Sequence, residues 1–71
     1  MKNNNEVLAS LEDERTLLTI KINKLDDFLN SNNSNHISNK QFRILQAQFA
    51  TMNVYHSILD FRIEDLQNDT N

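Results

Sequence analysis

The sequence predicts an all-α fold in which two helices form an antiparallel hairpin. Two ladders of mostly apolar residues alternate steps of three and four, the spacing at which an α-helix returns to one face. An Asn- and Ser-rich segment separates the ladders, and such residues favour turns because their side chains compete for backbone hydrogen bonds. The chain has no Gly and no Pro, so tight β-turns lack their usual residues.

The first ladder predicts a helix over residues 5–31. Acidic residues cluster in its first half, where the positive end of the helix dipole stabilises them. A loop over residues 32–37 follows, and so short a connection makes the two helices antiparallel. The whole chain, residues 1–71, is short enough to form a single domain. The ladder consists of Leu8, Leu11, Arg15, Leu18, Ile22, Leu25 and Leu29.

The second ladder predicts a helix over residues 38–67. Ser38 is a good N-cap, and Gln41 follows it at the spacing of a capping box. Ile37 and Phe42 occupy the two positions of a hydrophobic staple, so three signals agree on where this helix begins. The ladder consists of Phe42, Leu45, Phe49, Met52, His56, Leu59, Ile63 and Leu66.

A second set of apolar residues lies on the opposite side of each predicted helix. A helix that is apolar on both sides is normally buried on both sides, and two isolated helices rarely bury enough surface to offset the entropy of ordering them. We therefore expect hairpins to associate into a homo-oligomeric helical bundle. The alternative is scattered surface residues, which are common. The expected interface residues are Leu17, Ile20, Ile44, Val54, Ile58 and Phe61, with Ala47 in the same stripe.

Two polar residues, Arg15 and His56, interrupt the ladders in the same or adjacent layers of the predicted hairpin. A charge buried without a partner costs several kcal/mol. In one interpretation Arg15 extends to water while His56 is a neutral core histidine. In the other, the two residues belong to an anion site between helices, where the guanidinium binds phosphate.

A line of polar residues repeats every seven positions beside the second ladder: Gln41, Gln48, Tyr55 and Arg62. Glutamine can hydrogen-bond a base edge, tyrosine can stack on a base, and arginine can bind phosphate. The competing interpretation is the ordinary polar rim of a coiled coil. A basic cluster at the loop end, formed by Lys21, Lys24, Lys40 and Arg43, is typical of a solvated surface.

Composition argues against several functions. The net charge of −3 disfavours non-specific nucleic-acid binding, which needs a basic face. No run of apolar residues is long enough to span a membrane, and the first residues do not resemble a secretory signal, so we expect a cytoplasmic protein. Because Cys, metal-ligand spacing and phosphate-loop motifs are missing, we expect no metal, no cofactor and no enzymatic activity.

Residues 14–66 resemble a family of very short phage proteins, the hairpins known as crAss-phage-type related proteins. The resemblance rests on the run Lys21–Leu29, on Ile37-Ser38, and on a series over the second helix. That series is Gln41, Leu45, Gln48, Met52, Tyr55, Ile58, Leu59, Arg62 and Ile63. The hairpin is similar in shape to that of viral anti-CBASS and anti-Thoeris sponge proteins. The resemblance implies an oligomer that sequesters a nucleotide messenger between protomers, with roles for Gln48, Tyr55 and Arg62.

Two functions therefore lead. The first is a phage anti-defence protein that acts in the host cytoplasm and sequesters a cyclic nucleotide or an ADP-ribose-type signal without cleaving it, through Arg15, Gln48, Tyr55, His56 and Arg62. The alternative is a small interaction protein that inhibits a host protein through its helical faces. An assembly element without a ligand comes third, and an enzyme is the most remote possibility.

Overall fold

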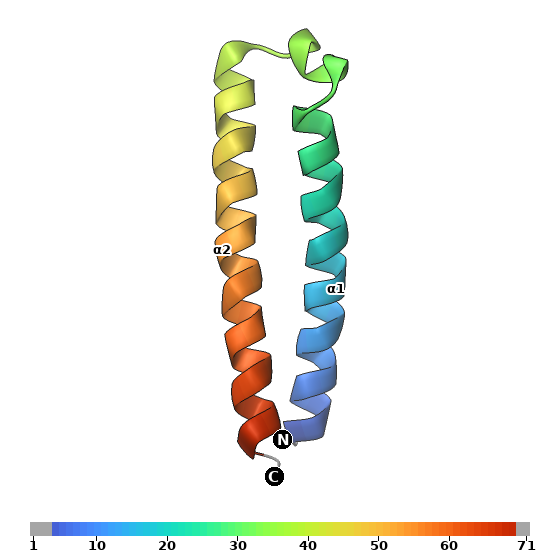
Figure 1. The fold of residues 1–71 in the computed structure, drawn as a ribbon, viewed down its shortest axis with the longest axis vertical. Coiled ribbons are helices and arrows are strands. Elements are labelled where there is room, and N and C mark those ends of the chain that lie inside the picture. Colours follow the sequence, from blue (N-terminus) through green and yellow to red (C-terminus); the bar gives the residue numbers. More distant parts are fainter. Residues whose placement is uncertain (1–3, 70–71) are drawn as a thin grey trace.

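The computed structural model describes residues 4–69, and within that range the fold is two helices without a strand. Helix α1 spans Asn4–Leu29, a short 3-10 helix η1 spans Asn32–His36, and α2 spans Asn39–Asp69. The two long helices lie side by side and run in opposite directions (Figure 1), which confirms the predicted hairpin. Residues 1–3 and 70–71 of the predicted single domain lie outside the described range.

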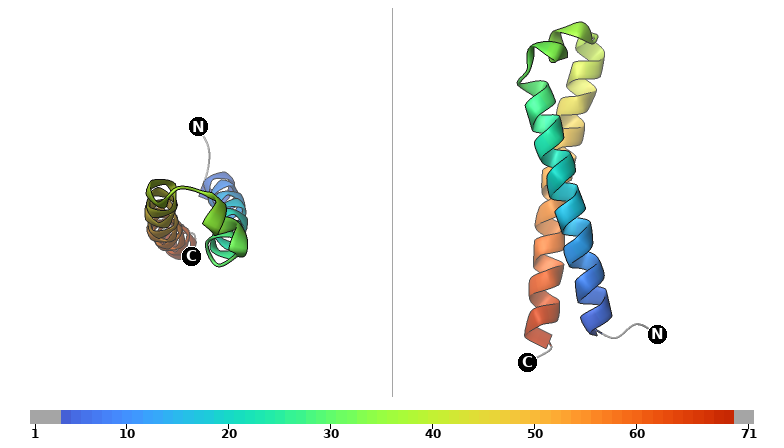
Figure 2. Two further views of the ribbon diagram at one scale, coloured as in Figure 1. Left: turned by 90° about the horizontal axis from the view of Figure 1, so that it is seen from above. Right: turned by 90° about the vertical axis from the view of Figure 1, so that its right-hand side faces the viewer.

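The hairpin is a long, narrow rod with principal extents of 50 × 20 × 15 Å. The connection containing η1 lies at one end of the rod, whereas the start of α1 and the end of α2 lie at the other (Figure 1). Figure 2 shows the two long helices as one pair, with no other described element along their long sides. Each helix therefore presents most of its circumference to solvent.

The core comes from the two ladders. Among the described residues four side chains are buried, namely Leu11, Leu18, Leu59 and Ile63, and Leu59 has no exposed surface at all. Half-buried ladder residues, including Ile22, Met52 and Leu66, pack around them. The seam, by which we mean the contact between the two ladders, is narrow because each helix contributes a single stripe of side chains to it. A core this thin leaves large apolar side chains exposed elsewhere.

Helix α1 ends at Leu29, two residues before its predicted end, and it does so without glycine. The Asn30 side-chain nitrogen donates to the Asp26 carbonyl oxygen at 2.9 Å, and the Ser31 hydroxyl donates to the Phe28 carbonyl oxygen at 2.8 Å. The same two carbonyl oxygens also accept the backbone N–H groups of Asn30 and Ser31, each at 3.1 Å, so the side chains reinforce the last turn. The segment predicted as a loop forms the 3-10 helix η1, and the Ser34 hydroxyl donates to the Ser31 carbonyl oxygen at 2.8 Å.

Helix α2 begins where the capping signals placed its start. The Gln41 backbone N–H donates to the Ser38 hydroxyl oxygen at 3.1 Å, and the Phe42 N–H donates to the Ser38 carbonyl oxygen at 2.9 Å. Ser38 is thus the N-cap of the helix. Ile37 and Phe42 are both half-buried, as expected for a hydrophobic staple.

Candidate functional site

Arg15 and His56 meet a shared carboxylate, Asp60, on one edge of the seam. The Arg15 Nη1 donates to Asp60 Oδ1 at 2.9 Å, and His56 Nδ1 lies 3.4 Å from Asp60 Oδ2. The other ring nitrogen, His56 Nε2, lies 2.9 Å from the Thr19 hydroxyl oxygen. The Thr19 hydroxyl also donates to the Arg15 carbonyl oxygen at 2.9 Å. The four side chains form one cross-helix network.

This network gives Arg15 and His56 a partner within the chain and so weakens the argument for a ligand there. Two polar interruptions in an apolar ladder seemed to need a partner, and Asp60 supplies it from within the chain. The side chains of Arg15 and Asp60 are 37% and 47% exposed, so this is a surface ion pair, worth about 0–1 kcal/mol. Sequence reasoning missed Asp60, although its position four residues after His56 places both on one helix face.

Tyr55 and Glu14 bridge the two helices on another edge. The Tyr55 hydroxyl donates to Glu14 Oε1. One heptad before Tyr55, the Gln48 amide nitrogen lies 3.9 Å from the Met52 sulfur, and one heptad after it stands Arg62. These three residues of the polar line are exposed, as is its fourth, Gln41. Among the side chains that the structure describes, those of residues 4–68, the guanidinium of Arg62 has no carboxylate partner, although its charge acts on Tyr55.

The two clusters occupy opposite edges of the seam. Tyr55 and Asp60 are five residues apart on α2, which turns them about 140° around the helix axis. Their partners on α1, Glu14 and Arg15, are adjacent in sequence and turned about 100° apart. The five predicted ligand residues therefore divide into two groups: Arg15 and His56 with Asp60, and Gln48 and Arg62 with Tyr55.

The Glu14 contact changes the ionisation of Tyr55. The hydrogen bond to Glu14 raises the pKa of the Tyr55 phenol above its ordinary value of 10.0, and some desolvation and the Glu14 charge act in the same direction, whereas Arg62 opposes them. At neutral pH the phenol is therefore a protonated donor. The carboxylate also fixes where the ring lies against α1.

We expect the phenol of the native protein to titrate above pH 10, with a midpoint that falls when Glu14 is replaced by Ala. Tyr55 is the only tyrosine and the chain has no tryptophan, so ultraviolet absorbance during a pH titration reports this group alone. Because folding favours the neutral phenol, its contribution to stability is complete below pH 10 and is lost as pH rises through the raised pKa. Asp13→Ala is the control, since it removes an equal charge one residue away; an equal shift there would assign the effect to general electrostatics.

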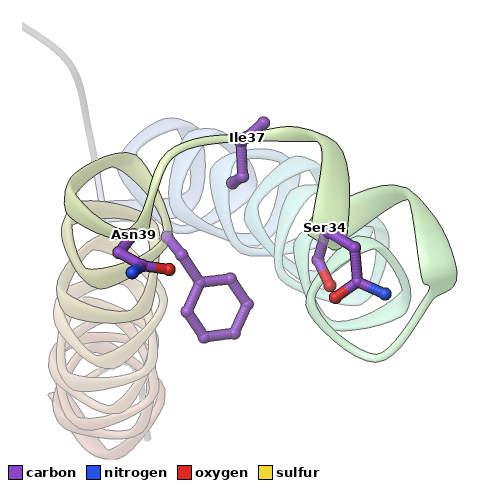
Figure 3. A pocket seen from close by; sticks show the side chains of 5 residues that line it. Ser34, Ile37 and Asn39 are labelled. Carbon is purple, nitrogen blue, oxygen red and sulfur yellow. The ribbon is translucent and has the colours of Figure 1, made fainter.

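A shallow pocket of about 270 Å³ lies at the loop end of the hairpin. It is lined by Ser34, Asn35, Ile37, Asn39 and Phe42. Figure 3 shows Ile37 on the connecting segment between the turn that holds Ser34 and the start of α2. Its lining offers hydroxyl, amide and apolar groups but no charged side chain. A phosphate would find no cation in this pocket, so the polar line of α2 is the better anion-binding candidate.

Two further features bear on the class of site. Within the described range, no three His, Asp or Glu side chains gather as a metal site would require. Neither long helix, as far as the structure describes it, is apolar enough to cross a membrane.

Comparison with known families bears on this geometry. The family model described as Sequestin matches residues 5–65, which covers both long helices apart from their outermost residues. No curated protein and no solved structure matches the chain. The matched span includes both edges of the seam and the whole polar line.

Proposed function

This chain belongs to the Sequestin family, and from that premise we propose that it is a phage anti-defence protein that sequesters a nucleotide messenger of bacterial immunity. It binds the messenger in the host cytoplasm as a homo-oligomer and does not cleave it. The family name itself denotes sequestration, which supports a binding role over a catalytic one. A cyclic nucleotide or an ADP-ribose derivative is the expected ligand class.

The observation that carries this proposal is the composition and exposure of the polar line. Arg62 is an exposed cation without a carboxylate partner in the described range, and a guanidinium binds phosphate through paired hydrogen bonds. Tyr55 lies one heptad away with its hydroxyl anchored by Glu14, so its ring is held in place for a base to stack on. Gln48, one heptad further, has an amide that can pair with a base edge. Arg62 thus offers a contact to phosphate, and Tyr55 and Gln48 offer contacts to a base.

The edge carrying Arg15 and His56 supports ligand binding less well. Its cation is already neutralised by Asp60 at 2.9 Å, and a phosphate there would have to displace the carboxylate. We keep both residues as candidate ligand groups of lower rank. Gln48, Tyr55 and Arg62 carry the proposal.

A panel of cyclic dinucleotides, cyclic trinucleotides and ADP-ribose derivatives tests this function by calorimetry and thermal shift. A messenger that binds only the folded protein raises the unfolding midpoint by mass action. Tyr55 fluorescence supplies a label-free signal from the proposed site itself, since no other tyrosine or tryptophan contributes. Denaturing the complex should release the nucleotide chemically intact. Absence of heat with every compound would favour a host-protein partner, and release of cleaved nucleotide would refute sequestration.

A further inference from the structure

The outer surface of α2 carries a second heptad ladder that the hairpin leaves uncovered. Ile58 and Phe61 flank the buried Leu59 and are turned about 100° and 200° from it, so they point away from the seam. The large members, Ile44, Val54, Ile58 and Phe61, are 46–69% exposed. Strict three- and four-residue steps over this length are the signature of a coiled-coil seam. The ladder reads Ile44, Ala47, Thr51, Val54, Ile58 and Phe61.

Helix α1 has no comparable ladder. Leu17 and Ile20 are exposed on its outer side, but the positions that would continue their heptad are Asp13 before them and Lys24 after them. The six residues expected at an oligomer interface are thus all exposed, yet they lie on two different helices. Only those on α2 form a continuous seam.

We propose that this ladder binds the same ladder of a second copy of the chain in antiparallel orientation. The product is a dimer in which the two α2 helices form the centre and the two α1 helices lie outside. The inference rests on side-chain volume and on charge, both of which separate the antiparallel pairing from the parallel one.

Side-chain volumes match only when the helices run in opposite directions. With the two-fold axis between Thr51 and Val54, Ile44 faces the partner's Phe61 and Ala47 faces the partner's Ile58. Each layer then combines a smaller residue with a larger one, as close packing at constant helix separation requires. A parallel pairing would place Phe61 against the partner's Phe61 and Ala47 against the partner's Ala47. One layer would be crowded and the other would leave a void.

Charges favour the same orientation. Extending the ladder one step at each end reaches Lys40 and Asp65, which face each other across an antiparallel dimer. Beside the ladder, Arg43 likewise meets the partner's Glu64 at the flanking positions that set orientation in coiled coils. None of these four residues has an ion-pair partner within the described part of its own chain. In a parallel dimer Lys40 would face the partner's Lys40 and Asp65 the partner's Asp65, which is unfavourable.

Thr51, the polar residue of this ladder, can be buried in the interface without losing a hydrogen-bond partner. The Thr51 hydroxyl donates to the Ala47 carbonyl oxygen at 2.9 Å, so its polar group is satisfied within its own helix. Its methyl group remains to pack against the partner's Val54. Burial of Thr51 therefore leaves no unpaired donor.

The dimer also brings the two polar lines together. Gln41, Gln48, Tyr55 and Arg62 occupy the other flanking positions of the same ladder, so Tyr55 lies beside the partner's Gln48 and Arg62 beside the partner's Gln41. Two equivalent sites result, each built from both protomers. This last step rests on the proposed nucleotide function, whereas the dimer itself does not.

Matched substitutions test the interface with the protein alone, by sedimentation at micromolar concentration. The unmodified chain should be a dimer, and Ile58→Asp should raise its dissociation constant at least about a hundredfold by placing a charge in an apolar layer. Ile20→Asp is the control, because Ile20 is 47% exposed and Ile58 is 46% exposed. A monomeric unmodified protein, or equal dissociation by Ile20→Asp, overturns the proposal. Failure to bind any nucleotide leaves this result unchanged and counts against the proposed function only.

Charge reversal and crosslinking test the orientation, including the case in which Ile58→Asp does not fold. Arg43→Glu and Glu64→Arg should each weaken the dimer, and the double variant should restore it, because the ion pair is rebuilt with reversed signs. The chain has no Cys. Oxidising a mixture of the Ile44→Cys and Phe61→Cys proteins therefore shows, by which disulfides form, which of these positions lie next to each other in the dimer. The antiparallel dimer should give only the mixed disulfide, since two Ile44 positions would be about 25 Å apart. Disulfides between identical variants, or no rescue by the double variant, would refute it.

Discussion

Leu59→Ala should lower the free energy of unfolding by about 3–5 kcal/mol, the largest stability effect expected of any single truncation in the seam. Leu59 has no exposed surface, and its neighbours in the core are Leu11, Leu18 and Ile63. The substitution removes transfer free energy and leaves a cavity that two rigid helices cannot close. Because the core holds only four buried side chains among the described residues, we expect the variant to be largely unfolded at 25 °C. Urea denaturation followed by circular dichroism measures the loss.

The control is Leu17→Ala, which removes the same atoms from a side chain that is 60% exposed. It should change the free energy of unfolding by less than about 0.5 kcal/mol. Both variants need the same protein concentration, because association couples stability to concentration. Similar losses in the two variants would mean that Leu17 is buried in an assembly, and that the seam inside one hairpin is not the main source of stability.

The parts of the fold that could be predicted are those set by local spacing. The four side chains that are buried among the described residues all belong to the two ladders, because steps of three and four residues return each ladder to one face of its helix. The N-cap of α2 was predicted correctly at Ser38, and the helix begins one residue after its predicted bound, at Asn39. Ser38, Gln41 and the staple pair act over a single turn, so the sequence alone can place them. The end of α1 was harder, because Asn30 and Ser31 terminate it through side-chain bonds to carbonyl groups and no glycine marks the position.

The candidate site was predictable only in part, because it depends on contacts between helices. Heptad spacing alone placed Gln48, Tyr55 and Arg62 on one line, and the structure shows all three exposed. The partners of the polar residues come from across the seam: Glu14 for Tyr55, and Asp60 for Arg15. Identifying these partners requires the register of α1 against α2. The two ladders alone do not determine that register to better than one helical turn. That register separates the five predicted residues onto two edges.

Arg62→Ala should weaken binding of the sequestered nucleotide at least about tenfold, the loss expected when a charge-assisted hydrogen bond to phosphate is removed. Arg62 is exposed and has no carboxylate partner in the described range, so its truncation should leave the hairpin folded. Tyr55→Ala should weaken binding to a similar extent by removing the stacking surface. Calorimetry against the ligand found in the nucleotide panel measures both losses, with circular dichroism and sedimentation verifying the fold and the assembly.

Arg15→Ala is the matched control for Arg62→Ala, since both remove one guanidinium and change the net charge equally. Arg15 is bound to Asp60 on the opposite edge of the seam, so its loss should change affinity by less than about twofold, an amount typical of distant charge in a salt-screened solution. If Arg15→Ala abolished binding while Arg62→Ala did not, the ligand would occupy the Asp60 edge and displace that carboxylate. Equal losses would indicate attraction by overall charge, which raising the ionic strength would remove. A loss confined to Arg62 and Tyr55 would place the nucleotide on the polar line of α2, because both residues belong to that line and Arg15 lies on the opposite edge.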